Sequence, residues 1–433
     1  MQFFRKSLLA STLLSLCGGA YAAGFQVTEH SAAGLGRANA GDGVLAEDAS
    51  VLAANPAAMT LIDKPTFSAM GAYIMPDIKV EGTHTNALHP QGVEAKKTDV
   101  APNAFVPAMY FVLPLNEGWT LGLGGFGNFG LKTQYNSDFQ AAALADESDL
   151  ITANFNASLA YEVDQSLSLG FGVNAVYAEA TLTTTAPDGT LVPGALLGLP
   201  LPAVDLSGQN ISKLEGDDWG YGWNLGVLYS VTPDTRLGLS YRSSVDLHVT
   251  GDISSELLAS KAGGFVDVEL PALWELAASH SFDDRLAVHG SVFRVQWSSF
   301  ERLTARFNDG TVASNVEEQW NDVWRFALGT SYQLSDSLVL RAGIQYDESP
   351  VDDQHRTLRI PDSSRTWYSL GLGYRLDNNW DIDFGYAYLD SKKKEIHEAS
   401  ETGNATIDAL VGRFDGKMSG DAHILALQAN YRF

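Results

Sequence analysis

Residues 322–334 read DVWRFALGTSYQL, and large apolar side chains occupy nearly every second position of this stretch. In an extended chain, one face would carry Trp324, Phe326, Leu328, Tyr332 and Leu334. The opposite face would carry Val323, Arg325, Ala327, Gly329, Ser331 and Gln333. A two-residue period of this kind predicts a β-strand whose two faces meet different surroundings.

The same period recurs along the chain. In residues 338–347 it places Arg341 and Asp347 on the polar face, and in residues 236–248 it places Arg242, Asp246 and His248 there. Soluble β-sandwiches alternate as well, but these strands span about 12–18 residues, against the five or six typical of soluble sheets. Length therefore favours a strand that crosses a membrane.

Turn spacing supports a transmembrane barrel. Short polar turns alternate with long irregular connections at 132–149, 183–216, 251–264, 305–317, 348–362 and 391–416. No segment after the N-terminal region offers 18 consecutive apolar residues, so a helical membrane protein is not expected. Because hydrocarbon cannot hydrogen-bond free backbone groups, the sheet must close on itself. We predict an all-β fold, a 14-stranded antiparallel transmembrane β-barrel, with strands at 66–81, 103–115, 118–134, 150–163, 166–182, 217–231, 234–250, 265–282, 285–304, 318–334, 337–347, 363–376, 379–390 and 417–433.

The last expected strand ends on an aromatic residue. Apolar side chains alternate along it up to the terminal Phe433. A terminal aromatic on an alternating strand resembles the signal that barrel-assembly machinery reads, so we expect that machinery as a partner. Outer-membrane lipid and lipopolysaccharide would surround the barrel wall, because its outer face is expected to be apolar all round. No second subunit is then needed to cover this face, so we expect a monomer.

Charge and the N-terminal residues place the chain in a cell envelope. Lys and Arg number 28 and Asp and Glu 52, a net charge of −24, which argues against a nucleic-acid binder. Residues 1–22 read as a signal peptide, with Arg5 and Lys6 before a short apolar run and a small-x-small site at Ala20 to Ala22. The single cysteine, Cys17, lies in that segment, so the mature chain would hold no disulfide.

Residues 23–63 lack the alternation of the barrel segments, which would occupy residues 64–433. They are rich in Gly and Ala and too few to form a domain with its own core. Fourteen strands enclose a lumen wider than wall side chains alone would fill. We therefore expect residues 23–63 to form a hatch, or plug, inside the barrel.

Several motifs together resemble a known family. Gly24-Phe25-Gln26, Gly34-Leu35-Gly36-Arg37-Ala38, Asn55-Pro56-Ala57, Trp219 to Asn224 and Ile360-Pro361-Asp362 occur at its spacing. The chain is similar over essentially its whole mature length to the FadL-type long-chain fatty acid transport proteins of Gram-negative outer membranes. The resemblance implies passive uptake of long-chain fatty acids, and the family also includes importers of aromatic or aliphatic hydrocarbons and possible exporters of oxidised fatty acids.

The resemblance also implies a route. A lipid would be captured at extracellular loops, pass a gate in the hatch, and leave sideways where the third strand is kinked. The gate positions match Phe25, Asn55, Pro56 and Ala57, and the kink matches Gly127, Asn128, Phe129 and Gly130. Glycine inside a strand is typical of a bulge or bend. Another explanation for the glycines of this strand is that they make room for the hatch.

One expected extracellular loop is unusually apolar. Residues 191–204 read LVPGALLGLPLPAV. An exposed apolar patch indicates a binding surface, which makes this loop the candidate for lipid capture, and the alternative is a local core between loops. The candidate residues are Leu196, Leu197, Leu199 and Leu201, with Leu257 and Leu258 from the next long loop.

A carboxylate ligand calls for a cation. Alternation directs Arg242, Arg325 and Arg341 into the lumen, where each is either a partner of the head group or paired with acids such as Asp246 and Asp347. No metal site, cofactor or catalytic residue is predicted. The histidines are scattered and no Gly-x-Ser-x-Gly motif occurs, which argues against an outer-membrane hydrolase. A general porin would not need the plug.

Overall fold

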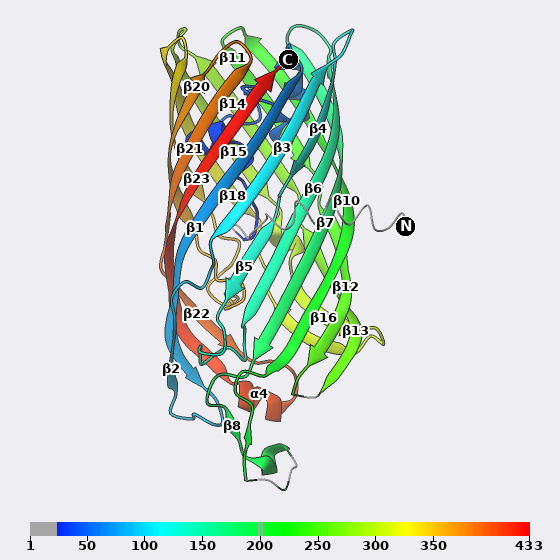
Figure 1. The fold of residues 1–433 in the computed structure, drawn as a ribbon, viewed down its shortest axis with the longest axis vertical. Coiled ribbons are helices and arrows are strands. Elements are labelled where there is room, and N and C mark those ends of the chain that lie inside the picture. Colours follow the sequence, from blue (N-terminus) through cyan, green and yellow to red (C-terminus); the bar gives the residue numbers. More distant parts are fainter. Residues whose placement is uncertain (1–23, 198–199, 201, 258) are drawn as a thin grey trace.

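The computed structural model describes residues 24–197, 200, 202–257 and 259–433, so the predicted signal peptide lies outside the described residues. The strands form an antiparallel barrel, which closes where β1 (Thr66–Thr85) pairs with β23 (Arg413–Arg432) (Figure 1). The predicted 14-stranded wall is confirmed. Its other members are β3 (Ala104–Pro114), β4 with β5 (Trp119–Phe126, Gly130–Gln134), β6 (Glu147–Glu162), β7 (Leu167–Thr185), β10 (Asn210–Thr232), β11 with β12 (Thr235–Arg242, Val245–Ser255), β13 with β14 (Ser260–Leu270, Leu273–Ser281), β15 with β16 (Leu286–Val295, Arg302–Phe307), β17 with β18 (Val312–Glu317, Val323–Ser335), β19 (Leu338–Asp347), β20 (Arg365–Arg375) and β21 with β22 (Trp380–Ser391, Lys394–Ala399).

The two ends of the barrel differ. At the short-turn end, which is uppermost in Figure 1, tight turns join the strands. The C-terminus also lies at this end. At the long-loop end the strands continue as hairpins well past the expected loop starts, and smaller elements decorate them. These elements are β2 (Val93–Lys97), β8 (Leu191–Val192), η2 (Gly194–Leu197), β9 (Val204–Asp205) and α4 (Ala405–Val411), whereas η3 (Trp297–Ser299) lies within the wall, between β15 and β16. Among the described residues, no helix is long and apolar enough to cross a membrane.

The outer face is apolar, as the period predicted. In β18, Trp324, Phe326 and Leu328 are 43%, 46% and 58% exposed, whereas the intervening Arg325 and Ala327 are buried. Large apolar side chains on the outside of a soluble barrel would carry a free-energy cost in water, but they match hydrocarbon. The wall therefore presents a lipid-compatible surface.

The alternation predicted for residues 236–248 is wrong beyond Arg242. Val245 and Leu247 are buried inside, and Asp246 and His248 are exposed outside. Asn224 pairs with Arg242 and Asp217 with Thr250, so the seventh strand advances eight residues where β10 advances seven. One extra residue forms a bulge between β11 and β12, and a single extra residue exchanges the two faces of a strand. Asp246 is therefore no lumen partner for an arginine.

Residues 24–62 lie inside the barrel, within its short-turn half (Figure 1). They contain α2 (Ala32–Gly36), α3 (Val51–Ala54) and η1 (Pro56–Leu61), and nearly all of them are buried. Ala32 N donates to Gln428 on β23, Gly41 N to Ser291 on β15, and Asn55 Nδ2 to the Val227 carbonyl on β10. We call these residues the N-terminal segment. Its contacts reach strands from several sides of the wall.

Wall glycines make this fit possible. A Cβ built on Gly343 would lie 2.1 Å from the Arg37 carbonyl oxygen, and one on Gly170 would lie 2.3 Å from Ala57 N. Such distances leave no room for any side chain. Similar clashes with the N-terminal segment occur at Gly122, Gly226, Gly238, Gly329, Gly371 and Gly385. Close backbone approach therefore explains a large part of the glycine content of the strands.

Candidate functional site

The third barrel strand is interrupted at Gly127 to Phe129. β4 pairs with both β3 and β6, but β5, which resumes at Gly130, has only β6 as its strand partner. Within the gap, Thr152 Oγ1 on β6 donates to the Phe129 carbonyl at 2.6 Å and accepts from Phe129 N at 3.1 Å. The third strand is therefore interrupted at the residues where a kink was expected, and among the described strands one edge of β5 has no neighbour in the wall.

The start of the N-terminal segment occupies that edge. Val27 N donates to the Asn128 carbonyl and Gly130 N donates to the Phe25 carbonyl, both at 2.8 Å. Gln26 and Phe129 face each other between these bonds as an isolated antiparallel pair. His30 lies 3.2 Å from the Gly127 carbonyl, and since a carbonyl only accepts, Nε2 carries the proton. Burial, followed by the nearby Arg242, lowers the pKa of His30 to about 3, which keeps it neutral.

The Phe25 side chain sits in an aromatic cluster. Its ring centroid lies 4.6 Å from Trp297, 5.6 Å from Phe300, 5.7 Å from Trp320 and 6.0 Å from Phe129. Edge-to-face contacts of this kind add to the stabilisation from burial. The structure thus brings Phe25 to the strand gap, next to the four residues predicted to form the kink.

The Asn55-Pro56-Ala57 motif lies elsewhere. Asn55 is fully buried, donates to the Gly43 and Val227 carbonyls, and accepts from Ala57 N to cap η1. Every one of these contacts fastens the segment to itself or to β10. The motif is therefore placed as an anchor, apart from Phe25 and the gap.

A small apolar cavity of about 40 Å³ adjoins Phe25 on the side of the long loops. Its lining is mainly apolar and consists of Phe25, Leu131, Ser148, Asp149, Leu150, Ala180, Leu182, Val266, Val268, Phe300, Leu303, Arg359 and Ile360. An apolar lining with few polar groups is typical of small-ligand pockets. The cavity offers an apolar surface beside a single guanidinium, that of Arg359.

Arg359 was missed by the sequence interpretation, which placed residues 348–362 in an extracellular loop. Residues 356–363 are instead buried and fold into the barrel mouth. Thr133 and Tyr135 donate to the Arg359 and Leu358 carbonyls at 3.0 and 2.9 Å. The Arg359 guanidinium donates only to carbonyl oxygens, those of Thr183 and Leu144, and forms no ion pair within the described part of the chain. The one available signal was the neighbouring Ile360-Pro361-Asp362 motif.

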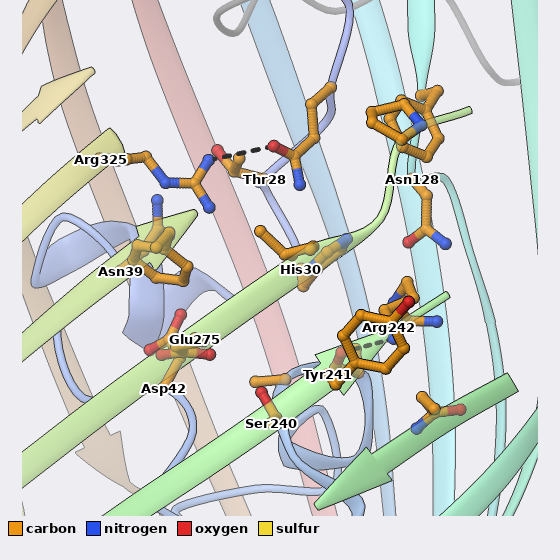
Figure 2. A pocket seen from close by; sticks show the side chains of 18 residues that line it. Thr28, His30, Asn39, Asp42, Asn128, Ser240, Tyr241, Arg242, Glu275 and Arg325 are labelled. Atoms are coloured by element: carbon orange, nitrogen blue, oxygen red, sulfur yellow. Dashed lines mark hydrogen bonds between the residues drawn. The ribbon is translucent and has the colours of Figure 1, made fainter. Parts of the chain in front are cut away.

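A second cavity, of about 50 Å³ and lined mostly by polar residues, lies between the N-terminal segment and the wall (Figure 2). Its lining consists of Gln26, Thr28, His30, Asn39, Asp42, Ala53, Ala54, Asn128, Phe129, Asn224, Ser240, Tyr241, Arg242, Pro271, Leu273, Glu275, Phe293 and Arg325. In Figure 2, Asp42, Glu275 and Arg325 lie toward one side, and Arg242 and Asn128 toward the other. Two of the three candidate arginines therefore reach one cavity.

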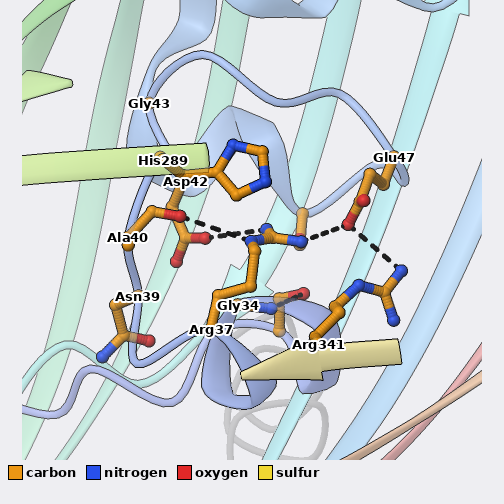
Figure 3. A network of polar contacts seen from close by, with 12 residues as sticks. Gly34, Arg37, Asn39, Ala40, Asp42, Gly43, Glu47, His289 and Arg341 are labelled. Carbon is orange, nitrogen blue, oxygen red and sulfur yellow. Dashed lines mark hydrogen bonds and ion pairs between the residues drawn. The ribbon is translucent and has the colours of Figure 1, made fainter. Parts of the chain in front are cut away.

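The third, Arg341, is held in a buried ion network (Figure 3). Its guanidinium lies 2.7 Å from Asp383 and 3.2 Å from Glu47, which also pairs with Arg37. Burial acts to raise the pKa of Glu47, but Arg341 and Arg37 outweigh it and hold the pKa at about 2. Arg341 thus joins the N-terminal segment to β19 and is not free to bind a ligand.

The predicted capture loop is described only in part. Leu199, Leu201 and Leu258 lie outside the described residues, and Leu196 and Leu197 belong to η2. Leu257 packs against a small core of Ala186, Val192 and Leu206, while Leu191 is 57% exposed. The local core and the exposed apolar surface therefore occur side by side.

Comparison with known proteins agrees with this geometry. Residues 13–433 match the family model described as outer membrane protein transport protein (OMPP1/FadL/TodX). The chain is 39% identical to outer membrane protein P1 of Haemophilus influenzae over the full length of both proteins. It is 34% identical to the long-chain fatty acid transport protein of Escherichia coli K12, with 99% of each chain covered. The crystal structure of a Pseudomonas aeruginosa FadL homologue superposes with a TM-score of 0.83 at 25% identity, covering 95% of this chain and 100% of that one.

These relatives are Gram-negative outer-membrane proteins with transport rather than enzymatic functions. Their similarity extends over the N-terminal segment as well as the barrel. The chain therefore belongs to the OMPP1/FadL/TodX family of outer-membrane transport proteins for fatty acids or hydrocarbons.

Proposed function

We propose that this protein is a channel for the passive uptake of long-chain fatty acids, which it captures at its extracellular loops and releases sideways into the membrane. The long-loop end faces the outside of the cell in this proposal, and the N-terminal segment acts as the hatch that closes the lumen. The Escherichia coli relative, named a long-chain fatty acid transport protein, supports this substrate class.

The observation that carries the proposal is a row of cavities along the interrupted third strand. Leu131 lines the apolar cavity and Asn128 with Phe129 lines the polar one. A third, smaller cavity lies at the gap itself, between Pro107, Gly125, Phe126, Gly127, Ala153, Asn154 and Phe155. Residues within the stretch 125–131 thus line all three cavities, which we assign as an entry site, an inner site and an opening in the wall.

Phe25 separates the first two cavities. It lines the apolar one, and its neighbour Gln26 lines the polar one. The bonds from Val27 and Gly130 that hold this stretch are few, whereas the remainder of the hatch is anchored by buried ion pairs. We infer that release of residues 25–30 from the third strand opens the path while the rest of the hatch stays in place.

The chemistry of the path suits an amphiphile. Each buried methylene contributes about 0.8 kcal/mol, which favours transfer of an acyl chain from the apolar cavity directly to lipid. Arg359 offers a charge-assisted hydrogen bond to a carboxylate at the first site. A lateral exit keeps the acyl chain out of water throughout.

The gap residues fit an exit. A Cβ on Gly125 would meet nothing within 4 Å and one on Gly127 only the Thr152 carbonyl at 3.5 Å, and both glycines line the cavity at the gap. By contrast, a Cβ built on Gly122 would lie 2.3 Å from the Met59 sulfur of the hatch. Gly122 therefore makes room for the hatch, while the space around Gly125 and Gly127 supports an exit.

Uptake of labelled oleate by cells that lack their own importer, with and without this protein, tests the proposal. A heat-dependent gel shift would confirm that the barrel is folded in the membrane. We expect oleate entry well above background. Absence of entry by a folded barrel would contradict the fatty acid assignment, and uptake of labelled toluene or hexadecane instead would move the substrate to hydrocarbons.

A further inference from the structure

We infer that Arg242 and Asn224 form a second carboxylate site inside the barrel, at the strand gap, which holds the head group of a fatty acid as its acyl chain leaves the wall. The inference rests on the proposed function and adds to it a defined head-group site on the exit path. It assigns different roles to Arg242 and Arg341.

Arg242 differs from Arg341 by its partners. Its guanidinium donates to Asn174 Oδ1 at 2.8 Å and to the Ala53 carbonyl at 2.7 Å, and it forms no ion pair with any described residue. Arg341 is paired with two carboxylates. Arg325 interacts electrostatically with four carboxylates, those of Glu29, Asp42, Glu275 and Asp347. Since a cation withdrawn from bulk water without a counter-ion is unfavourable, Arg242 is left with a demand for an anion.

Asn224 supplies an unused donor beside it. Its Oδ1 accepts from Asn156 Nδ2 at 2.9 Å and from Asn174 Nδ2 at 3.0 Å, which fixes the orientation of the amide. Its Nδ2 is buried, has no hydrogen-bond partner, and belongs to a residue that lines the polar cavity and is only 2% exposed. Buried donors without partners are rare in native structures and call for an explanation.

The surroundings fit an anion rather than a cation. Asn174 Oδ1 already accepts from Arg242, Asn154 and Asn156, so this side of the cavity offers N–H groups and few free acceptors. The carboxylates of Asp42 and Glu275 lie across the cavity, beside Arg325 (Figure 2). A carboxylate can therefore accept from Arg242 and Asn224 together.

The position connects this site to the exit. The Arg242 guanidinium carbon lies 5.6 Å from the ring centroid of Phe126, and Phe126 lines the cavity at the strand gap. A head group bound at Arg242 would therefore leave its first methylenes next to Phe126, with the opening between β3 and β6 in front of them. A hydrocarbon would pass the same opening without using Arg242.

The test compares labelled oleate with labelled oleyl alcohol, which keeps the chain and lacks the carboxylate. Arg242→Met removes the cation. Asn224→Asp keeps the Oδ1 acceptor for Asn156 and Asn174 and replaces the unused donor by an oxygen. Arg285→Gln, which removes an exposed cation from a short turn, is the matched control.

We expect both site variants to lower the initial rate of oleate uptake about tenfold or more, since hydrogen bonds to charged groups are lost, and to leave oleyl alcohol uptake within about twofold. Arg285→Gln should match the wild type. If Arg242→Met fails the heat-shift test for folding, Asn224→Asp decides the question.

The outcomes separate the two claims. If the wild type imports oleate and both site variants import it at the same rate as the wild type, the head-group site is overturned and the proposed function stands. Equal losses for oleate and oleyl alcohol would show that the residues only shape the wall, and would also overturn the site. A wild type that imports neither probe would refute the proposed function itself.

Discussion

Gly343→Ala adds one methyl group where the hatch backbone contacts the barrel wall. The added Cβ would lie 2.1 Å from the Arg37 carbonyl oxygen and 2.2 Å from the Arg37 carbonyl carbon. Ordinary contact distances begin at 3.4 Å, so the hatch backbone must withdraw by about 1 Å or more. Arg37 cannot follow freely because its guanidinium is bound to Glu47, Asp42 and the Ala40 carbonyl. Overpacking of this kind costs about 1–3 kcal/mol.

Because that cost falls on the contact between hatch and wall, we expect Gly343→Ala to lower the thermal midpoint and to produce ion-conducting openings in planar bilayers, where the wild type stays closed. The matched control is Gly290→Ala, whose Cβ would lie 3.7 Å from the nearest atom, the Ala327 carbonyl oxygen. It should behave as the wild type. A Gly343→Ala barrel that is as stable and as closed as Gly290→Ala would refute the tight fit on which the hatch proposal depends.

Three further changes test other parts of the path. Gly127→Val should narrow the strand gap and slow oleate uptake severalfold in a folded barrel, while Gly290→Val should not. Equal uptake rates in these two variants would contradict the proposed lateral exit. Phe25→Ala removes the centre of the aromatic cluster, at a local cost of about 3–5 kcal/mol. Hydrogen exchange of the Gly130 amide, which donates to the carbonyl of residue 25, should therefore accelerate when it is measured by mass spectrometry. Unchanged protection of this amide would contradict the role of the Phe25 ring. Glu318, between β17 and β18, accepts a hydrogen bond from Trp320 Nε1 at 3.0 Å, so Glu318→Leu, which leaves this buried donor unpaired, should lower the thermal midpoint, and an unchanged midpoint would contradict the importance of this bond.

The barrel could be predicted because lipid imposes a simple pattern on its wall. Trp324, Phe326 and Leu328 all face outward, as the two-residue period predicts. Predicting an apolar outer face needs neither the order of these side chains nor knowledge of what they contact. The pattern failed at residues 243–244, where one extra residue exchanges the faces. No property of Ser243 or Ser244 announces a bulge, because the strand continues with an equally regular alternation on both sides.

The site was harder to predict because it depends on what the hatch and loops contact. Arg242, Arg325 and Arg341 share the same sequence context, and only the positions of Glu47 and Asn174 distinguish an ion-paired arginine from one with neutral partners. Arg359 was overlooked because a loop folded into a barrel mouth has the same polar composition as one exposed to water.

The central claim is that residues 25–30 must leave the third strand for a fatty acid to pass. Gln26 and Phe129 form the pair between two hydrogen bonds, a position where Cα atoms are about 4.5 Å apart and a disulfide fits. Since Cys17 is the one native cysteine and lies in the predicted signal peptide, Gln26→Cys with Phe129→Cys would form an unambiguous cross-link. The single-cysteine variants are the controls.

The decisive measurement is oleate uptake by this double variant in its oxidised and reduced forms, with cross-linking quantified by mass spectrometry. We predict background uptake when the disulfide is formed and recovery to the level of the single-cysteine variants after reduction. A fully cross-linked barrel that imports oleate as fast as the reduced one would contradict the account.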